Sequence, residues 1–139
     1  RAAKAKTWDI VIHGAAVSDY RPDQVHPGKI NSDPEELILR LVRTPKLISH
    51  LRAWFGSACL IGFKLFSGTP AEERLRVALA QIQKSKTDLC IENDLTEFGP
   101  GEHKARIVTA HGEAIEIPKG DKAAVGRAIW LYVQRVQGY

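Results

Sequence analysis

Two apolar runs, Ala58-Cys-Leu-Ile-Gly-Phe63 and Asp88-Leu-Cys-Ile91, decide the fold class of this chain. The first is continuous and bounded by residues that break regular structure, which is typical of a strand buried on both faces of a parallel sheet. Between the two runs, Thr69-Pro-Ala-Glu72 predicts a capping box, and apolar residues at helical spacing continue to about Lys86. A strand, a helix and a second strand with short connections predict a parallel βαβ unit.

The residues upstream of this unit predict another strand and another helix. An apolar run from Trp8 to His13 predicts a first strand, in which His13 is interpreted as a core or interface residue rather than a catalytic one. Alternating charge in Glu36 to Arg43 also favours a strand. Thr44-Pro45 then predicts a helix start, with Thr as N-cap and Pro as first helical residue, and the helix runs through Phe55 to a stop at Gly56. Residues 1–6 are interpreted as the last turn of an earlier helix.

The residues downstream predict a hairpin and a final helix. Ala105 to Thr109 and Glu113 to Ile117 alternate in polarity across a short turn, which predicts a β-hairpin. Asp121 caps a last helix, whose apolar face comprises Val125, Ile129, Tyr132, Val133 and Val136. The predicted fold is therefore α/β, a doubly wound (Rossmann-like), mainly parallel sheet with a C-terminal β-hairpin at one edge, in a single domain over residues 1–139.

Composition narrows the class of protein. The 139 residues are 44% apolar and 26% charged, as in a soluble globular domain, and the net charge of +4 is spread along the chain. Because no basic block stands out, nothing favours nucleic-acid binding, whereas acidic small ligands remain compatible. No run has transmembrane length and no signal peptide is present, so we expect no membrane partner and a cytoplasmic location. Cys59 and Cys90 lie in apolar runs without metal-ligand spacing, so we expect reduced structural thiols and no metal site.

The loop from Gly14 to Ile30 is the first candidate for chemistry. Gly14, Ala15 and Ala16 leave room for a ligand beside the backbone, and Asp19 and Lys29 add one anion and one cation. The alternative is a surface turn with two solvated charges.

Other candidates follow from the rule that ligands bind beyond the carboxyl ends of the strands in an open α/β sheet. The predicted helix start at Thr44, with Lys46 in its first turn, is a candidate phosphate seat. Phe63, at a predicted strand end, either stacks on a base or packs in the core. The glycine-rich and metal-binding motifs of common nucleotide enzymes are absent. The residues by themselves are compatible with an enzyme of phosphorylated substrates that uses lysines, dipoles and Mg²⁺, and they indicate no more than that.

Five motifs in fixed order carry a family resemblance. They are Ala15-Ala-Val-Ser-Asp-Tyr20, Lys29-Ile30, Arg43-Thr-Pro-Lys-Leu-Ile48, Leu60-Ile-Gly-Phe-Lys-Leu65 and Asp88-Leu-Cys-Ile-Glu-Asn-Asp94. From Trp8 to the last helix, the chain resembles phosphopantothenate–cysteine ligase, also called phosphopantothenoylcysteine synthetase. The sequences of its Gly-Phe-Lys-Leu and Thr-Pro-Lys motifs resemble those of the monofunctional and eukaryotic-type ligases more than those of the bifunctional bacterial enzyme.

The resemblance implies a role in coenzyme A biosynthesis. CTP or ATP, with Mg²⁺, would activate 4′-phosphopantothenate as an acyl-nucleotidylate, and the amine of cysteine would then displace the nucleotide. Lys29 matches the catalytic lysine of a flap that closes over this intermediate. Nucleotide-binding positions of the family match Asp19, Lys29, Thr44, Pro45, Lys46, Leu47, Phe63 and Lys84, and substrate-binding positions match Ala15 and Ala16. The resemblance also implies a homodimer.

The chain departs from the family in two residues and in its extent. Ala80 replaces a basic residue, and Glu92 replaces an alanine where a carboxylate would repel a triphosphate. The family's N-terminal half, with its glycine-rich turn, is not in these 139 residues, so we expect it in cis or as a separate chain, and we expect the chain alone to be inactive. Ala80 and Glu92 are the support for an alternative, a non-catalytic α/β nucleotide-binding or assembly module that kept the fold.

Overall fold

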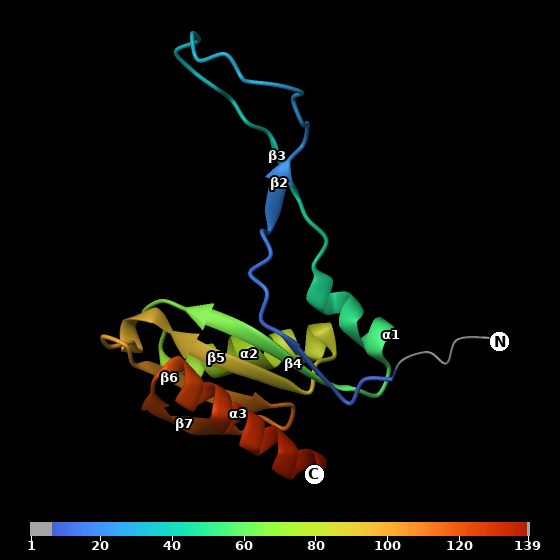
Figure 1. The fold of residues 1–139 in the computed structure, drawn as a ribbon, viewed down its shortest axis with the longest axis vertical. Coiled ribbons are helices and arrows are strands. Elements are labelled where there is room, and N and C mark those ends of the chain that lie inside the picture. Colours follow the sequence, from blue (N-terminus) through green and yellow to red (C-terminus); the bar gives the residue numbers. More distant parts are fainter. Residues whose placement is uncertain (1–6, 139) are drawn as a thin grey trace, which may run out of the picture. The chain divides into compact units, whose positions relative to one another are not determined.

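The computed structural model describes residues 7–138, and the predicted helical turn over residues 1–6 lies outside them. Contacts divide the chain into two compact units (Figure 1). We call Ala15–Leu47 the ribbon unit, and the remaining residues the sheet unit. The sheet unit contains β1 Ile10–His13, α1 Leu51–Phe55, β4 Cys59–Phe66, α2 Ala71–Ser85, β5 Leu89–Asp94, β6 His103–Thr109, β7 Ala114–Gly120 and α3 Lys122–Gln137, with 3-10 turns η1 Leu47–His50, at its boundary, and η2 Leu95–Glu97. The ribbon unit contains β2 Tyr20–Pro22 and β3 Leu41–Arg43.

The sheet unit confirms the predicted fold class. Its five strands lie in the order β1-β4-β5-β6-β7, and β1, β4 and β5 run parallel to one another. The register pairs Ile10 with Cys59 and Ile61 with Leu89. The predicted hairpin is present as β6 and β7 at one edge of the sheet, where β6 runs antiparallel to both β5 and β7. Both buried strands extend beyond their apolar runs, β4 to Phe66 and β5 to Asp94.

Alternate residues of the central strands pack on opposite faces, so the sheet lies between two helical layers (Figure 1). On one face, Ile61 and Ile91 form a core with Ile129 and Val133 of α3. On the other face, Cys90 packs against Ala78 and Ile82 of α2. A third cluster joins Leu60 to Leu51 of α1 and its neighbours, Val11, Ile48, Phe55 and Ala58.

The helix predicted to start at Thr44 begins later. Residues 47–50 form η1, the α-helix starts only at Leu51, and its N-cap is His50. Thr44 is not an N-cap because its hydroxyl donates a hydrogen bond to the Ser18 carbonyl oxygen, inside the ribbon unit. The predicted stop is confirmed, since Gly56 is the C-cap with a φ of 51°.

Two further predictions, of a strand's length and of a helix cap, are wrong. The strand predicted over Glu36 to Arg43 is limited to Leu41–Arg43. It pairs with β2 in a separate two-stranded sheet, and β2 lies in a segment for which the sequence predicted only a loop. The capping box predicted at Thr69 does not form, because the N-cap of α2 is Pro70 and makes no side-chain cap hydrogen bond.

The last helix follows its sequence signals closely. The Asp121 carboxylate accepts a hydrogen bond from the Ala124 backbone N–H at 2.6 Å, and Gly138 ends the helix in the left-handed conformation with a φ of 77°. Val136 is exposed, contrary to its predicted place on the buried face, because it lies in the last turn beyond the sheet core. Among the described residues, no helix is both long and apolar enough to cross a membrane.

The two cysteines are buried and unbonded, as predicted for structural thiols. Burial raises the pKa of the Cys90 thiol to about 12, and burial with the Asp88 charge also raises the pKa of Cys59. Because both pKa values are raised, the two thiols are protonated at neutral pH. The thiolate is the reactive form, so these thiols are unreactive.

Gly62 lets helical segments approach β4 closely, and this makes a testable prediction. A β carbon at this position would lie 2.9 Å from Ile48 Cδ1 and 3.0 Å from Gln81 Nε2. We expect Gly62→Ala to lower the free energy of unfolding by about 1 kcal/mol, at the low end of the cost of overpacking, because the two atoms that must shift are ends of flexible side chains. Gly126→Ala is the matched control: it lies inside α3 with open space around it, and is expected to stabilise by about 0.5–1 kcal/mol. Chemical denaturation measures both changes, and equal signs would contradict the packing argument.

Candidate functional site

The ribbon unit brings together two motif segments that are far apart in the sequence. β2 and β3 pair with Tyr20 opposite Arg43, and the Thr44 backbone N–H donates to the Asp19 carbonyl oxygen at 3.0 Å. The Lys46 ammonium lies 2.6 Å from Asp19 Oδ1. Because both side chains are more than half exposed, this ion pair contributes little to stability and its groups remain open to a ligand.

Three other predicted site residues also belong to the ribbon unit. Ala15 and Ala16 follow β1 in exposed irregular backbone, and Lys29 lies in the exposed segment between β2 and β3. Asp19, which the sequence grouped with Lys29 as an anion and a cation of one loop, is paired instead with Lys46. No helix begins at Thr44, because Thr44 to Lys46 lie in irregular backbone before the 3-10 turn that starts at Leu47. Phosphate binding at these residues stays a prediction, without the helix N-terminus that was expected to support it.

Phe63 lies within β4 of the sheet unit, beside the chain segment that leaves β1. A β carbon added to Gly14 would lie 3.8 Å from Cδ2 and Cε2 of the Phe63 ring, which is van der Waals contact. Phe63 is 38% exposed, so part of its surface is accessible to a ligand. The absence of a side chain at Gly14 therefore gives room beside an aromatic surface.

Lys84 lies away from the carboxyl ends of the parallel strands. It is exposed in the last turn of α2, whereas residues just before the first turn of that helix bond to Asp94 at the end of β5. Because α2 connects two parallel strands, its last turn lies toward the amino ends of the sheet. The structure thus brings Asp19, Thr44 and Lys46 together and does not group Lys84 with Phe63.

Asp94 is a buried carboxylate at the carboxyl end of β5. It accepts hydrogen bonds from the Thr96 hydroxyl at 2.7 Å and from the backbone N–H groups of Gly68 and Thr69 at 2.9 Å. The Thr96 hydroxyl and then these backbone donors hold the pKa of Asp94 well below its usual range, against the opposing effect of burial. Asp94 thus holds the segment that precedes α2, and it is the N-cap of η2 rather than of α2. In the described part of the chain, no group of three or more His, Cys, Asp or Glu side chains could hold a metal ion.

Glu92 does not present a free charge to a ligand. Its side chain is 1% exposed, Arg106 Nε donates a hydrogen bond to Oε1, and Arg74 Nε lies 3.5 Å from Oε2. Two guanidinium groups therefore neutralise the carboxylate inside the fold, and the repulsion of a triphosphate expected from the sequence does not follow. Glu92 and Arg106 are direct cross-strand partners in the β5–β6 register.

Arg74 extends this buried ionic cluster to the carboxyl end of β5. Its guanidinium lies 3.5 Å from Asp94 and 3.1 Å from Glu97, and its side chain is almost fully buried. Burial opposes its charge, but the Glu97 hydrogen bond and the surrounding carboxylates raise the pKa of Arg74 above its ordinary value. Arg106 Nη2 also donates to the Ala71 carbonyl oxygen at 3.1 Å. The cluster fixes the first turn of α2 to the strand ends.

Comparison with known proteins identifies the family. Residues 1–136 match the DNA/pantothenate metabolism flavoprotein C-terminal domain. The Coenzyme A biosynthesis bifunctional proteins CoaBC of Thermococcus kodakarensis and Methanocaldococcus jannaschii are 31% and 33% identical over 96% and 95% of this chain. The chain spans about a third, 32%, of the length of each. That the chain is of the monofunctional type, which the sequences of two motifs indicated, stays a prediction.

Solved structures give the same result for the fold. A DNA/pantothenate metabolism flavoprotein from Streptococcus pneumoniae aligns with a TM-score of 0.78 and 29% identity, over 95% of this chain and 64% of that one. The C-terminal domain of a Coenzyme A biosynthesis bifunctional protein CoaBC aligns with a TM-score of 0.68 and 25% identity, over 92% of this chain and 54% of that one. The chain therefore belongs to the family of DNA/pantothenate metabolism flavoprotein C-terminal domains.

Proposed function

We propose that this chain is the C-terminal part of a ligase domain that joins 4′-phosphopantothenate to cysteine in coenzyme A biosynthesis. The family and the names of the CoaBC relatives support this role. In the first step, a carboxylate oxygen of phosphopantothenate attacks the α-phosphorus of a nucleoside triphosphate, and pyrophosphate leaves. In the second step, the cysteine amine attacks the acyl carbon, the nucleoside monophosphate leaves and the amine loses a proton.

The observation that carries the proposal is the assembly of Asp19, Thr44 and Lys46 in the ribbon unit. These residues come from two motifs of the ligase resemblance, and backbone and side-chain contacts join them. An exposed ammonium beside a carboxylate can exchange that partner for a phosphate oxygen at small cost. We assign Asp19 and Thr44 to Leu47 to nucleotide binding and Ala15 and Ala16 to the phosphopantothenate side.

Lys29 is assigned to the reacting phosphate. Charge develops on the α-phosphate as pyrophosphate leaves, and an ammonium group placed there stabilises it. We propose that CTP or ATP enters as its Mg²⁺ complex, because Mg²⁺ in such enzymes is bound mainly by substrate phosphates and water. Phe63 is assigned to the base. The family resemblance alone supports the assignment of Lys84 to the triphosphate, because Lys84 lies in the last turn of α2, away from the carboxyl ends of the strands.

We further propose that the chain acts with the rest of a ligase domain, in cis or as a separate chain. The relatives are about three times as long, since the chain spans 32% of their length. We expect the 139 residues alone to release no pyrophosphate from phosphopantothenate, cysteine and nucleotide, and turnover by the purified chain would overturn this part of the proposal. We place the enzyme in the cytoplasm.

A homodimer is also proposed. The ribbon unit exposes several large apolar side chains, namely Val25, Leu37, Ile38, Leu39 and Leu41. Burial of such side chains against a second copy would remove apolar surface from water. Light scattering on the purified chain gives its molar mass, and a monomer at all concentrations would contradict the proposal.

Calorimetric titration with ATP and CTP, each with Mg²⁺, tests the nucleotide assignment. We expect saturable binding of one nucleotide, weakened about tenfold or more by Phe63→Ala because base–aromatic stacking contributes about 1–3 kcal/mol. Trp130→Ala is the matched control, since Trp130 is an aromatic of similar exposure on α3. Absence of saturable heat with both nucleotides would favour the non-catalytic assembly module instead.

A further inference from the structure

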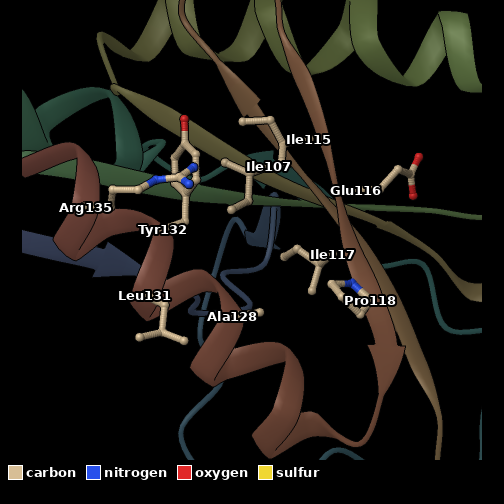
Figure 2. A pocket seen from close by; sticks show the side chains of 9 residues that line it. All are labelled: Ile107, Ile115, Glu116, Ile117, Pro118, Ala128, Leu131, Tyr132 and Arg135. Carbon is tan, nitrogen blue, oxygen red and sulfur yellow. The ribbon is translucent and has the colours of Figure 1, made fainter.

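A groove of about 370 Å³ lies between α3 and the edge hairpin of β6 and β7. Its walls are apolar, formed by Ile107, Ile115, Ile117, Ala128 and Leu131 (Figure 2). Ile107 and Ile117 belong to the main core, and Ile115 and Ala128 pack against it. The groove is thus an open continuation of the core, of the size range of small-molecule sites.

The groove shares no residue with the proposed ligase site. Its walls come from α3, β6 and β7, whereas the residues assigned above to the ligase come from the ribbon unit, β4 and α2. None of those assigned residues lines the groove. A ligand bound here would contact the opposite face of the sheet from α2.

Two charged residues line the groove, Arg135 of α3 and Glu116 of β7. Arg135 lies along its wall, with Cζ 5.6 Å from the centroid of the Tyr132 ring. In the described part of the chain, no carboxylate oxygen lies within 4.0 Å of a guanidinium nitrogen of Arg135. The carboxylate of the lining residue Glu116 points away from α3 in Figure 2 and lies 3.7 Å from Lys104 and 3.8 Å from Arg106.

We propose that this groove binds a small monocarboxylate with an aliphatic body. The isoleucine walls remove the aliphatic part from water, and the planar guanidinium of Arg135 matches the two oxygens of a carboxylate. The Glu116 carboxylate points away from α3 and lies near two cations, so Arg135 supplies the charge on the α3 side and an anionic head is favoured over a cationic one.

Titration of the isotope-labelled chain with octanoate, followed by NMR, tests the site. We expect saturable shifts confined to α3, β6 and β7, and weaker binding of octan-1-ol and octylammonium. Arg135→Gln is expected to weaken octanoate about tenfold or more, because a hydrogen bond to a charged group contributes about 1.5–3 kcal/mol. Arg127→Gln, on the same helix outside the groove, is the control and should leave the affinity unchanged.

Three results would overturn the proposal: no saturable shift, octanoate affinity equal to that of octanol, or an Arg135→Gln variant that binds octanoate as tightly as the original. Ala128→Leu, which fills the groove, should abolish binding of both octanoate and octanol. Thermal unfolding of each variant shows that it is folded. Nucleotide binding by the same samples is expected to be unchanged by the groove variants. A failure of octanoate binding can therefore be distinguished from a failure of the ligase proposal.

Discussion

Replacing Lys29 by methionine is expected to lower the rate of ligation by about a hundredfold or more, because loss of one charge that stabilises a transition state typically has an effect of this size. The loss should appear in kcat rather than in nucleotide affinity, since the ammonium is assigned to charge that develops on the reacting phosphate. Lys29→Arg keeps the charge and should recover part of the rate. The protein for this assay is the chain joined to the residues that precede the matched region in the Thermococcus kodakarensis relative.

Lys122→Met is the control for the loss of a lysine. Lys122 is exposed at the first position of α3, outside all assigned site residues, so its replacement should leave the rate unchanged. Steady-state release of pyrophosphate measures both variants. Equal rates for Lys29→Met and the unsubstituted chain would remove Lys29 from the reaction.

Glu92→Ala is expected to lower the free energy of unfolding by about 3–5 kcal/mol, because removing one partner of a buried ion pair leaves the other charges uncompensated. Arg106 and Arg74 would both lose their carboxylate partner at this position. Glu73→Ala is the matched control. Glu73 pairs with Arg76 on the exposed surface of α2, and its loss should change stability by no more than about 0.5 kcal/mol.

A second variant separates the ion pair from simple loss of volume. Arg106→Met alone should also be destabilising, but Glu92→Leu combined with Arg106→Met removes both charges and should be more stable than Glu92→Ala. Denaturant unfolding measures all four proteins. If Glu92→Ala had the same small effect as Glu73→Ala, the buried cluster would not be a structural element of the fold.

The central strands and the last helix could be predicted from the sequence because their signals are local and strong. A continuous apolar run such as Cys59 to Gly62 leaves a strand as the favoured interpretation, and Asp121 and Gly138 mark the ends of α3. The limits of the strands were missed where polar residues continue them. Glu92 and Asp94 belong to β5 because buried partners satisfy their charges, and apolar periodicity does not report such partners.

The predicted site shows the same limit. The residue types at Asp19, Thr44 and Lys46 suggested an anion site, but Thr44-Pro45 was interpreted as a helix start, whereas Thr44 bonds to Ser18 across the ribbon. A short strand such as Tyr20–Pro22 has too few residues to show alternation. The pairing of Glu92 with Arg106 had a partial signal, since Glu92 follows one predicted strand directly and Arg106 lies in the other, and the two carry opposite charges.

The most direct measurement is product analysis by mass spectrometry, with the joined protein supplied with phosphopantothenate, cysteine, Mg²⁺ and either CTP or ATP. The account predicts phosphopantothenoylcysteine and nucleoside monophosphate in equal amounts, with pyrophosphate released and Lys29→Met almost inactive. A folded joined protein that forms no product with either nucleotide would contradict the ligase assignment. Nucleoside diphosphate in place of monophosphate would contradict the acyl-nucleotidylate step.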